Sequence, residues 1–453
     1  MLSLRGRVGR HANTGIHCQN WKDDQEFVIS LLNSIPPADG GTGGSLGGRV
    51  VAGIASDPLY RSILHFEKTY FGRQSGFVDP GGPMLAKLEA LATRTHSPPA
   101  PPPPKGPWDD LKTKSVLDGL RKGMEGDDHR LDQSDVVEII RNTLSDGVVS
   151  ADELADLSTI ATNSKSISPR SRKLLETFVN EVRKNTAGKG PYSLSTYKQQ
   201  WAADRTCDFL KGAGAKYFPH LDRDEVGVGI LMRIANPGLL DQGQAGVCGA
   251  AAMLFNVAND NPGRYAAFAI DLYERGKAHI DGFDIAPGDD VRNYTIPAAA
   301  LMSQVDWMTM ASLRDSENWI YHFSSYNDKD GGTTPAEEEK WFKRAGYSDV
   351  QNETNDIFSK DADNADEATR LFNQGYSVVL FIHSNMLHAD KQTKTSRGPS
   401  HVVVLQSPID RSGGYVKFKV FTWGQRDYQV PQGAALSEAD FLENYYGYVA
   451  GKP

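Results

Sequence analysis

The sequence predicts an α+β protein, and three observations support this prediction. A proline-rich run, Ser97–Pro107, divides the chain and cannot join a packed core. On its two sides, residues 24–96 and 108–187 carry apolar residues at helical spacing. Residues 188–453 then show helical patterns first and β-rich patterns second. That order is typical of a domain in which helices and an antiparallel sheet are segregated.

Residues 1–23 are basic and show little hydrophobic periodicity, so we expect a flexible lead there. The folded part is predicted to begin at residue 24, where apolar residues share one helical face: Phe27, Val28, Leu31 and Leu32.

Residues 24–96 resemble a peptidoglycan-binding helical module. The resemblance rests on the pair Leu31-Leu32, on ILHFEKTYFG (Ile63–Gly72), and on the turn FVDPGGPMLAKL (Phe77–Leu88) before the last helix. It implies binding to peptidoglycan. Gly/Pro turns also join short helices in many small bundles, so a structural or docking module is the alternative.

Residues 108–187 are predicted to form a second small all-helical module. Within it, SDGVVSADE (Ser145–Glu153) is similar to the end of an EF-hand loop, with Glu153 as the last ligand. Leu144 stands where such a loop needs an oxygen ligand. The favoured interpretation is therefore a helix start capped by Ser150, and Ca²⁺ binding is the alternative.

Three segments of the last domain are rich in β-branched and aromatic residues and predict strands. They are SVVLFI (Ser377–Ile382), HVVVLQ (His401–Gln406) and YVKFKVFTW (Tyr415–Trp423). Ser412–Gly414 lies between the last two and predicts a hairpin that joins them.

Composition excludes several classes of protein. The formal net charge is −8, which argues against a nucleic-acid partner gripped through its phosphates. No apolar run approaches the roughly 20 residues of a membrane helix, so we expect no integral membrane segment. The N-terminus lacks the apolar core of a Sec signal. The 3 cysteines are far apart and unpaired in sequence, so we expect no disulfide framework, metal site or cofactor.

Cys248 has the sequence context of a nucleophile. In NPGLLDQGQAGVCGAAAMLFNVAND (Asn236–Asp260) it follows a glycine-rich stretch and precedes a helical pattern. We therefore expect it at a helix N-terminus, where the dipole favours thiolate and its amide can donate to an oxyanion. Gln242 offers a neutral amide donor to the same oxyanion. Cys18 and Cys207 lack this context and are predicted to be inert buried thiols.

The favoured base is His401, which begins a predicted strand directly after a Gly-Pro turn. It follows Cys248 by roughly 150 residues, close to the spacing in papain-like enzymes. His383, at the end of the strand Ser377–Ile382, is the alternative base. His388 lies in a polar insertion and is predicted to be a solvated loop residue.

These segments resemble the papain-like cysteine proteases. The run from Gln242 to Ala250 resembles that family's oxyanion glutamine and nucleophilic cysteine. Ser400–Val404 resembles its histidine strand, and Val420–Gly424 resembles its strand that ends in Asn-Ser-Trp-Gly. The resemblance implies a papain-like fold for residues 188–453 and a thiol peptidase that works through an acyl-enzyme.

Two departures from the family pattern stand out. Phe421 occupies the position of the orienting asparagine and cannot accept a hydrogen bond from an imidazole. Thr422 and Gln425 are the preferred replacements, ahead of Asp427. Gly249 follows the nucleophile and departs from the family's usual Ser/Ala-Cys-Trp context. We expect this glycine to leave the substrate subsite next to the cysteine open.

The chain as a whole resembles secreted bacterial protease toxins such as type VI secretion effectors. That resemblance implies synthesis in the bacterial cytoplasm and injection without a Sec signal. It also implies a protein substrate in the target cell, a cognate immunity protein and a component of the secretion machinery as partners. The alternatives are a peptidoglycan amidase or endopeptidase, a transglutaminase-like acyl transferase, and a non-catalytic papain-like binding module.

Overall fold

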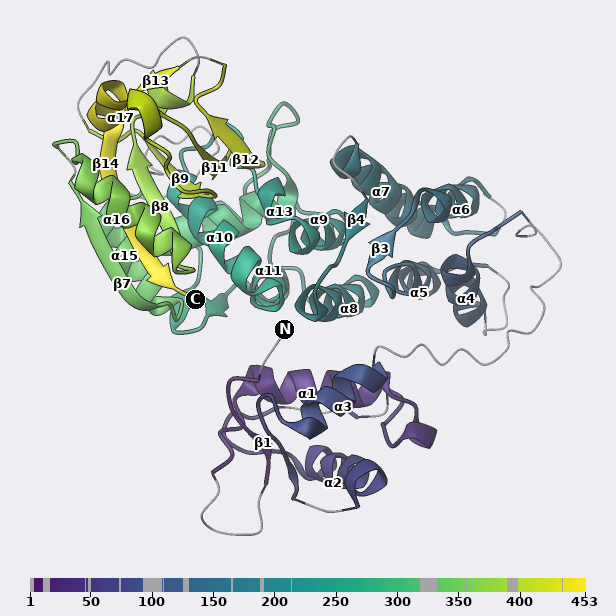
Figure 1. The fold of residues 1–453 in the computed structure, drawn as a ribbon. Coiled ribbons are helices and arrows are strands. Elements are labelled where there is room, and N and C mark those ends of the chain that lie inside the picture. Colours follow the sequence, from purple (N-terminus) through teal and green to yellow (C-terminus); the bar gives the residue numbers. More distant parts are fainter. Residues whose placement is uncertain are drawn as a thin grey trace. The chain divides into compact units, whose positions relative to one another are not determined.

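The protein divides into two compact units, Met1–Pro103 and Pro104–Pro453, and the division falls inside the predicted proline-rich linker (Figure 1). The computed structural model describes residues 4–10, 17–44, 46–47, 50–72, 75–92, 108, 110–124, 130–163, 166–187, 191–212, 214–317, 332–355, 357–388, 398–433 and 435–453. The linker itself, residues 97–107, lies outside the described residues.

The described part of the first unit is a small helical module with a two-stranded ribbon. Its helices are α1 (Lys22–Ser34), α2 (Asp57–Phe71) and α3 (Pro83–Ala92), with a 3₁₀ turn at Pro37–Asp39. The ribbon pairs β1 (Val8–Gly9) with β2 (Phe77–Val78) in antiparallel register. The apolar stripes predicted from sequence meet in its core: Val28, Leu31, Leu32, Ile63, Phe66 and Leu88.

The expectation of a flexible lead over residues 1–23 is wrong for its described part. Residues 4–10 include strand β1, and Leu4 and Val8 are buried. Asp24 accepts a hydrogen bond from the Gly6 amide at 2.9 Å. The basic residues gave no sign of this strand. Each arginine of the segment lies over an aromatic ring of the same unit: Arg5 over Trp21, Arg7 over Phe77 and Arg10 over Tyr60.

The second unit begins with a large helical half. Its longer helices are α4 (Lys114–Gly123), α5 (Gln133–Thr143), α6 (Ala151–Thr162), α7 (Pro169–Thr186), α8 (Tyr197–Lys211), α9 (Arg223–Ala235), α10 (Cys248–Asp260), α11 (Pro262–Arg275) and α15 (Pro335–Arg344). Shorter pieces are a 3₁₀ turn (Pro237–Leu239), α12 (Asp289–Arg292), α13 (Gln304–Asp306), a π-helical turn (Trp307–Ala311) and α14 (Ser312–Glu317). Two ribbons pair β3 (Val148–Val149) with β4 (Tyr192–Ser193) and β5 (Ala278–Ile280) with β6 (Phe283–Ile285).

Residues 108–187 are not a separate module, contrary to the sequence prediction. Strand β3 pairs with β4 across the expected boundary at residue 187. The Gln133 amide donates to Asp224 at 2.7 Å, and one hydrophobic core extends from Trp108 to Val449. The amphipathic helices α4 to α7 therefore complete the core of the second unit instead of enclosing their own.

The EF-hand-like segment is a helix start. Ser150 caps α6 by accepting from the Glu153 amide, and the Glu153 side chain accepts in return from the Ser150 amide at 2.8 Å. This capping box uses the carboxylate that a Ca²⁺ loop would need. Among the described residues, no group of three or more His, Cys, Asp or Glu side chains is placed to hold a metal ion.

The second half of this unit is built on one antiparallel sheet. The strand order is β12-β11-β9-β8-β14-β7, and every neighbouring pair is antiparallel. The bounds are β7 (Ser348–Thr354), β8 (Ser377–Ile382), β9 (His401–Leu405), β11 (Phe418–Thr422), β12 (Gln425–Val430) and β14 (Tyr445–Lys452). A small ribbon of β10 (Tyr415–Val416) and β13 (Leu436–Ser437) lies beside it. The chain is thus α+β, as the sequence predicted.

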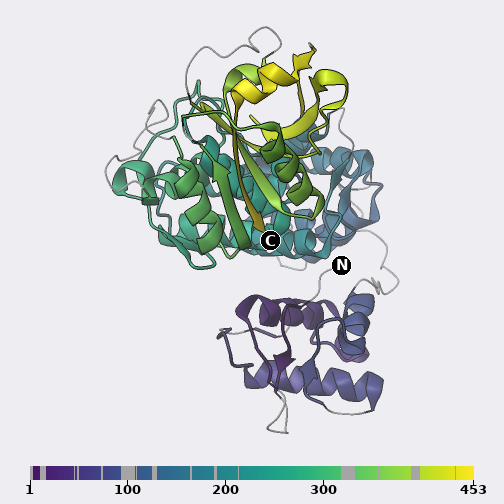
Figure 2. The ribbon, with the colours of Figure 1, turned by 60° about the vertical axis from the view of Figure 1, so that its left-hand side comes forward.

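The sheet separates two cores because successive side chains of a strand point to opposite faces. Val402, Val404 and Phe421 join the core of the helical half. On this face of the sheet, α10 packs against β9. Val403, Leu405 and Val420 join a second core, covered by α16 (Ala362–Asn373) and α17 (Glu438–Asn444) (Figure 2). Within the described residues, each helix is too short or too polar to cross a bilayer.

Candidate active site

Cys248 is the first residue of α10, as the glycine-rich approach predicted. No side chain caps this end of the helix, so its first amides are available to a ligand. The space beside Gly249, in contrast, is filled, because a Cβ atom there would lie 2.4 Å from Thr333. The expected open subsite at Gly249 is therefore wrong, and glycine is needed for the close approach of the 332–334 segment.

The nucleophile candidate meets the head of strand β9. Helix α10 packs against β9, and the Val402 amide acts as a hydrogen-bond donor toward the Cys248 thiol. Val402 directly follows His401, so the start of β9 lies near the thiol although the two segments are far apart in sequence. The helix start at Cys248 and the strand start at His401 are both observed, as the sequence predicted.

The His401 ring is buried and held on two sides. Its Nε2 atom lies 2.7 Å from the Thr422 hydroxyl, and the ring stacks on Trp423 with centroids 5.0 Å apart. Burial and, to a smaller extent, the neighbouring His388 lower the pKa of His401 to about 4. The imidazole is therefore neutral at physiological pH in this structure.

The turn between β11 and β12 explains why Thr422 reaches His401. Trp423 and Gly424 both have positive φ, at 46° and 69°, and form a two-residue hairpin turn between the paired residues Thr422 and Gln425. Thr422 is buried, whereas Gln425 is exposed. Of the two preferred partners for the ring, the structure brings only Thr422 into contact with His401 among the described interactions.

The remaining predicted partners lie elsewhere. Phe421 stacks on Phe255 of α10 with centroids 4.0 Å apart, so this position joins the helix to the sheet. Asp427 is exposed and pairs with Lys419 at 3.8 Å. His383 is buried at the end of β8, where its ring accepts from the Asn385 amide at 3.3 Å.

Gln242 belongs to a tight turn that leads to Cys248. One N–H of its side-chain amide donates to the Ala245 carbonyl at 2.8 Å, and the Ala245 amide donates back to the Gln242 carbonyl at 3.0 Å. The side chain is buried, with 8% of its surface exposed. These two hydrogen bonds therefore fix the orientation of Gln242 within the loop.

The electrostatics of the thiol differ from expectation. Burial raises the pKa of the Cys248 thiol, while the amides of Val402, Gly249 and Cys248 itself act in the opposite direction as donors. The sequence predicted a lowered thiol pKa from the helix N-terminus alone. In the structure, burial instead favours the neutral thiol over the thiolate.

Sequence reasoning misses two groups, one near the thiol and one beside the His401 imidazole. Glu338 of α15 is fully buried, and among the described residues neither of its carboxyl oxygens has a hydrogen-bond partner. Burial raises the pKa of Glu338 well above its usual value, and a charge there would raise the pKa of Cys248 further. Trp423 was treated only as part of a motif, yet it contacts His401 and also His388, at 5.6 Å between centroids. His388 itself is exposed, as predicted.

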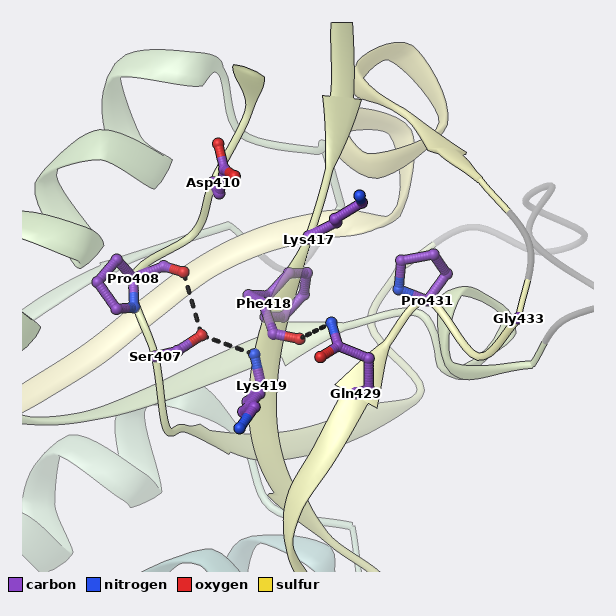
Figure 3. A pocket seen from close by; sticks show the side chains of 9 residues that line it. All are labelled: Ser407, Pro408, Asp410, Lys417, Phe418, Lys419, Gln429, Pro431 and Gly433. Carbon is purple, nitrogen blue, oxygen red and sulfur yellow. Dashed lines mark hydrogen bonds between the residues drawn. The ribbon is translucent and has the colours of Figure 1, made fainter. Parts of the chain in front are cut away.

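The larger described cavity lies away from these residues. It has a volume of about 480 Å³ and is lined by residues of β11, β12 and the preceding loop, including Ser407, Lys417 and Gln429 (Figure 3). Gln429 donates to the Phe418 carbonyl at 3.1 Å within it. The lining includes neither Cys248 nor His401.

Comparison with known proteins gives no relative for this chain: no protein-family model, no curated protein and no solved structure matches it.

Proposed function

We propose that the protein is a cysteine-dependent peptide hydrolase with a papain-like catalytic domain, in which Cys248 is the nucleophile and His401 the base. One observation carries the proposal. The thiol at the start of α10 lies at the head of β9, and the first residue of that strand is His401, whose imidazole is oriented by Thr422 and Trp423. A thiol and an oriented imidazole are the two groups that acyl transfer requires.

The hydrogen bond to Thr422 indicates which ring nitrogen is basic. If Nε2–H donates to the Thr422 hydroxyl, the lone pair of the neutral ring is on Nδ1. His401 Nδ1 then takes the thiol proton as Cys248 Sγ bonds to the substrate carbonyl carbon. The imidazolium returns that proton to the leaving amine, and water releases the thioester by the reverse sequence.

The oxyanion that forms in each step needs donors. The Cys248 amide lies at the uncapped end of α10, and the second N–H of the Gln242 amide can supply another hydrogen bond. In this mechanism a neutral thiol gives its proton to a neutral, buried imidazole, which costs free energy. Hydrogen bonds from these donors to the oxyanion offset that cost.

The test is labelling and hydrolysis by matched cysteine variants. A radiolabelled epoxysuccinyl inhibitor is expected to modify Cys248, as mapped by mass spectrometry, and His401→Ala should abolish that modification. Hydrolysis of unfolded casein should be lost in Cys248→Ala and retained in Cys18→Ala and Cys207→Ala. A Cys248→Ala protein that still hydrolyses casein would rule out the proposal.

We further propose that this hydrolase is a secreted bacterial toxin with a protein substrate and a cognate immunity protein. The support is the resemblance of the chain to such effectors. Expression in bacteria should arrest growth for the wild type but not for Cys248→Ala, and new protein N-termini should appear only with the wild type. Release of muropeptides from purified sacculi would instead identify a cell-wall enzyme.

A further inference from the structure

A buried ion pair lies directly behind the loop that carries Gln242. Arg233, near the end of α9, donates through Nε to Asp306 at 2.6 Å, and a second bond joins its Nη2 to the other carboxylate oxygen. Asp306 is fully buried and Arg233 is 6% exposed. Such pairs add little stability on average because desolvation of two charges offsets their attraction. The position of this pair therefore calls for another explanation.

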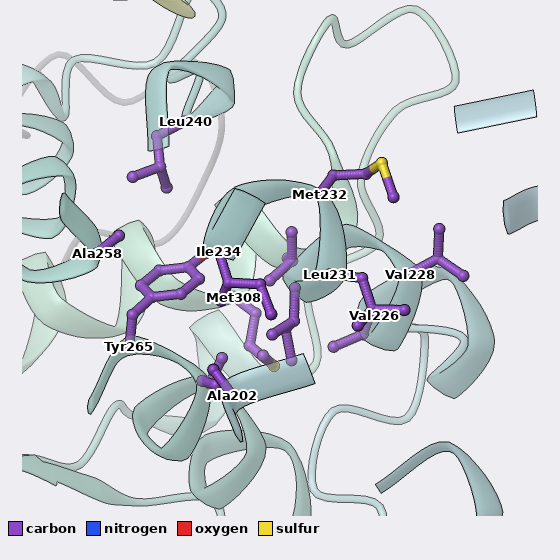
Figure 4. Close-up of a cluster of buried hydrophobic side chains, with 14 of the residues drawn as sticks. Ala202, Val226, Val228, Leu231, Met232, Ile234, Leu240, Ala258, Tyr265 and Met308 are labelled. Atoms are coloured by element: carbon purple, nitrogen blue, oxygen red, sulfur yellow. The ribbon is translucent and has the colours of Figure 1, made fainter. Parts of the chain in front are cut away.

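The pair binds the backbone on both sides of Leu240. Arg233 Nη2 donates to the Leu239 carbonyl at 3.2 Å, and the Asp241 amide donates to Asp306 at 3.2 Å. Leu240 itself is buried in the cluster that includes Ala258 and Tyr265 (Figure 4). The chain is thus fixed at three successive residues immediately before Gln242.

The same loop also touches the turn that carries the His401 partners. A Cβ atom at Gly424 would lie 3.1 Å from Asp241, and one at Gly238 would lie 2.7 Å from Arg426. The Asp241 side chain also accepts a hydrogen bond from the Gly243 amide at 2.9 Å. The backbone on the Cys248 side of Gln242 is therefore held as well. The loop is therefore held between the ion pair and the β11–β12 hairpin.

We infer that Arg233 and Asp306 are positioning residues, which set the Gln242 loop so that its side-chain amide completes the oxyanion hole of Cys248. The inference rests on the proposed function. Neither residue contacts the thiol, so both act through the backbone of residues 239–241.

The experiment separates oxyanion binding from thiol reactivity. Iodoacetamide alkylates a thiol without forming an oxyanion, whereas the peptide aldehyde acetyl-Leu-Leu-argininal forms a hemithioacetal. In that adduct the Cys248 Sγ–carbon bond replaces the S–H bond, and the aldehyde oxygen gains the proton or remains an oxyanion held by donors. The affinity of the aldehyde is measured by its protection of Cys248 against iodoacetamide.

We expect Asp306→Asn to weaken aldehyde affinity about 100-fold, the order of magnitude of losing an oxyanion donor, with iodoacetamide alkylation changed less than threefold. Gln242→Ala should give a similar loss. In the Gln242→Ala background, Asp306→Asn should have no further effect, because both changes remove the same interaction. Arg233→Lys keeps the charge but not the fork of donors, so it should give an intermediate loss.

Asp306→Asn leaves Arg233 buried without its partner and can unfold the protein. The paired variant Arg233→Met with Asp306→Leu removes both charges together, which buried ion pairs tolerate, and circular dichroism checks its fold. It is expected to show the same weakened aldehyde affinity.

Wild-type affinity in the paired variant would overturn the inference, as would additive losses in the cycle with Gln242→Ala. If the wild-type thiol is alkylated but the aldehyde gives no protection, the oxyanion hole is absent and the proposed function itself fails.

Discussion

Two cysteines of the helical half lie in helices but in different chemical surroundings. Cys207 is in the middle of α8 and is fully buried, whereas Cys248 begins α10 and is partly exposed. Burial raises the pKa of both thiols, that of Cys207 to about 12. Around Cys207 the amides are already bonded within the helix, and the charged neighbours are mixed: Arg141, Asp204, Asp208 and Glu138.

The difference shows that position along a helix matters more than burial alone. At a helix start the amides have no intrahelical acceptor, so they can stabilise a thiolate or an oxyanion. Cys248 has one such donor in the Gly249 amide and another donor in the Val402 amide of β9, whereas no amide donor is described for Cys207. The predictions below test this contrast between an inert thiol and a thiol surrounded by donors.

The largest expected effect is in alkylation at pH 8. In a Cys18→Ala background, iodoacetamide should modify Cys248 on the order of 1,000-fold faster than Cys207, because the latter needs both a rare thiolate and local opening of the protein. Quenched time points and peptide mass spectrometry give both rates. Equal rates for the two thiols would remove the basis of the comparison.

The buried His401 should make the protein sensitive to acid. Its folded-state pKa of about 4 lies below the ordinary value of 6.5, so the unfolded chain binds more protons between these pH values. The free energy of unfolding should therefore fall as pH drops from 6.5 toward 4, by about 3 kcal/mol from this group.

Urea denaturation at several pH values measures this effect. His401→Gln cannot titrate and should remove that part of the pH dependence, whereas the exposed His388→Gln should not. An unchanged pH dependence in His401→Gln would contradict a buried, neutral imidazole.

Local patterns predicted much of the site. The start of α10 at Cys248 and the start of β9 at His401 follow from small residues before a helical stripe and from a β-branched run after a turn. Thr422 was one of two preferred partners of His401, because it lies next to Phe421 in sequence, and the structure brings Thr422 to the ring.

Other features depend on tertiary packing and left no local signal. Glu338 reaches the neighbourhood of Cys248 only because α15 packs on α10. The raised pKa of the thiol reflects burial beneath elements distant in sequence, which outweighs the helix N-terminus. The separate module over residues 108–187 was wrong for a related reason, because amphipathic helices do not indicate which core they cover.

A smaller effect is expected from the orienting hydroxyl. Thr422→Val keeps the shape of the side chain but cannot bond Nε2, so the ring loses the contact that fixes its tautomer. Casein hydrolysis should fall about 10-fold, with iodoacetamide alkylation of Cys248 nearly unchanged. Gln425→Ala is the matched control on the other side of the turn. A loss in Gln425→Ala without one in Thr422→Val would reverse the assignment.

The smallest effect concerns Glu338, a buried acid whose carboxyl oxygens have no hydrogen-bond partner among the described residues. Because the folded-state pKa of Glu338 is raised, its stabilising contribution is complete below the unfolded pKa and is lost as pH rises toward the folded pKa. The Gln side chain of Glu338→Gln cannot ionise. The free energy of unfolding of this variant at pH 7 should therefore be about 1 kcal/mol higher than that of the wild type. It should also speed alkylation of Cys248 at alkaline pH, since a nearby negative charge is removed.

Glu337→Gln is the neighbouring control for Glu338→Gln. Glu337 pairs with Arg314 at 3.0 Å and closes the capping box of α15 with the Thr334 amide at 2.7 Å, so its replacement should destabilise the protein. Stability curves from pH 5 to 9 distinguish the two variants. A Glu338→Gln protein that is less stable than the wild type at pH 7 would mean that the Glu338 carboxyl makes a favourable interaction in the fold.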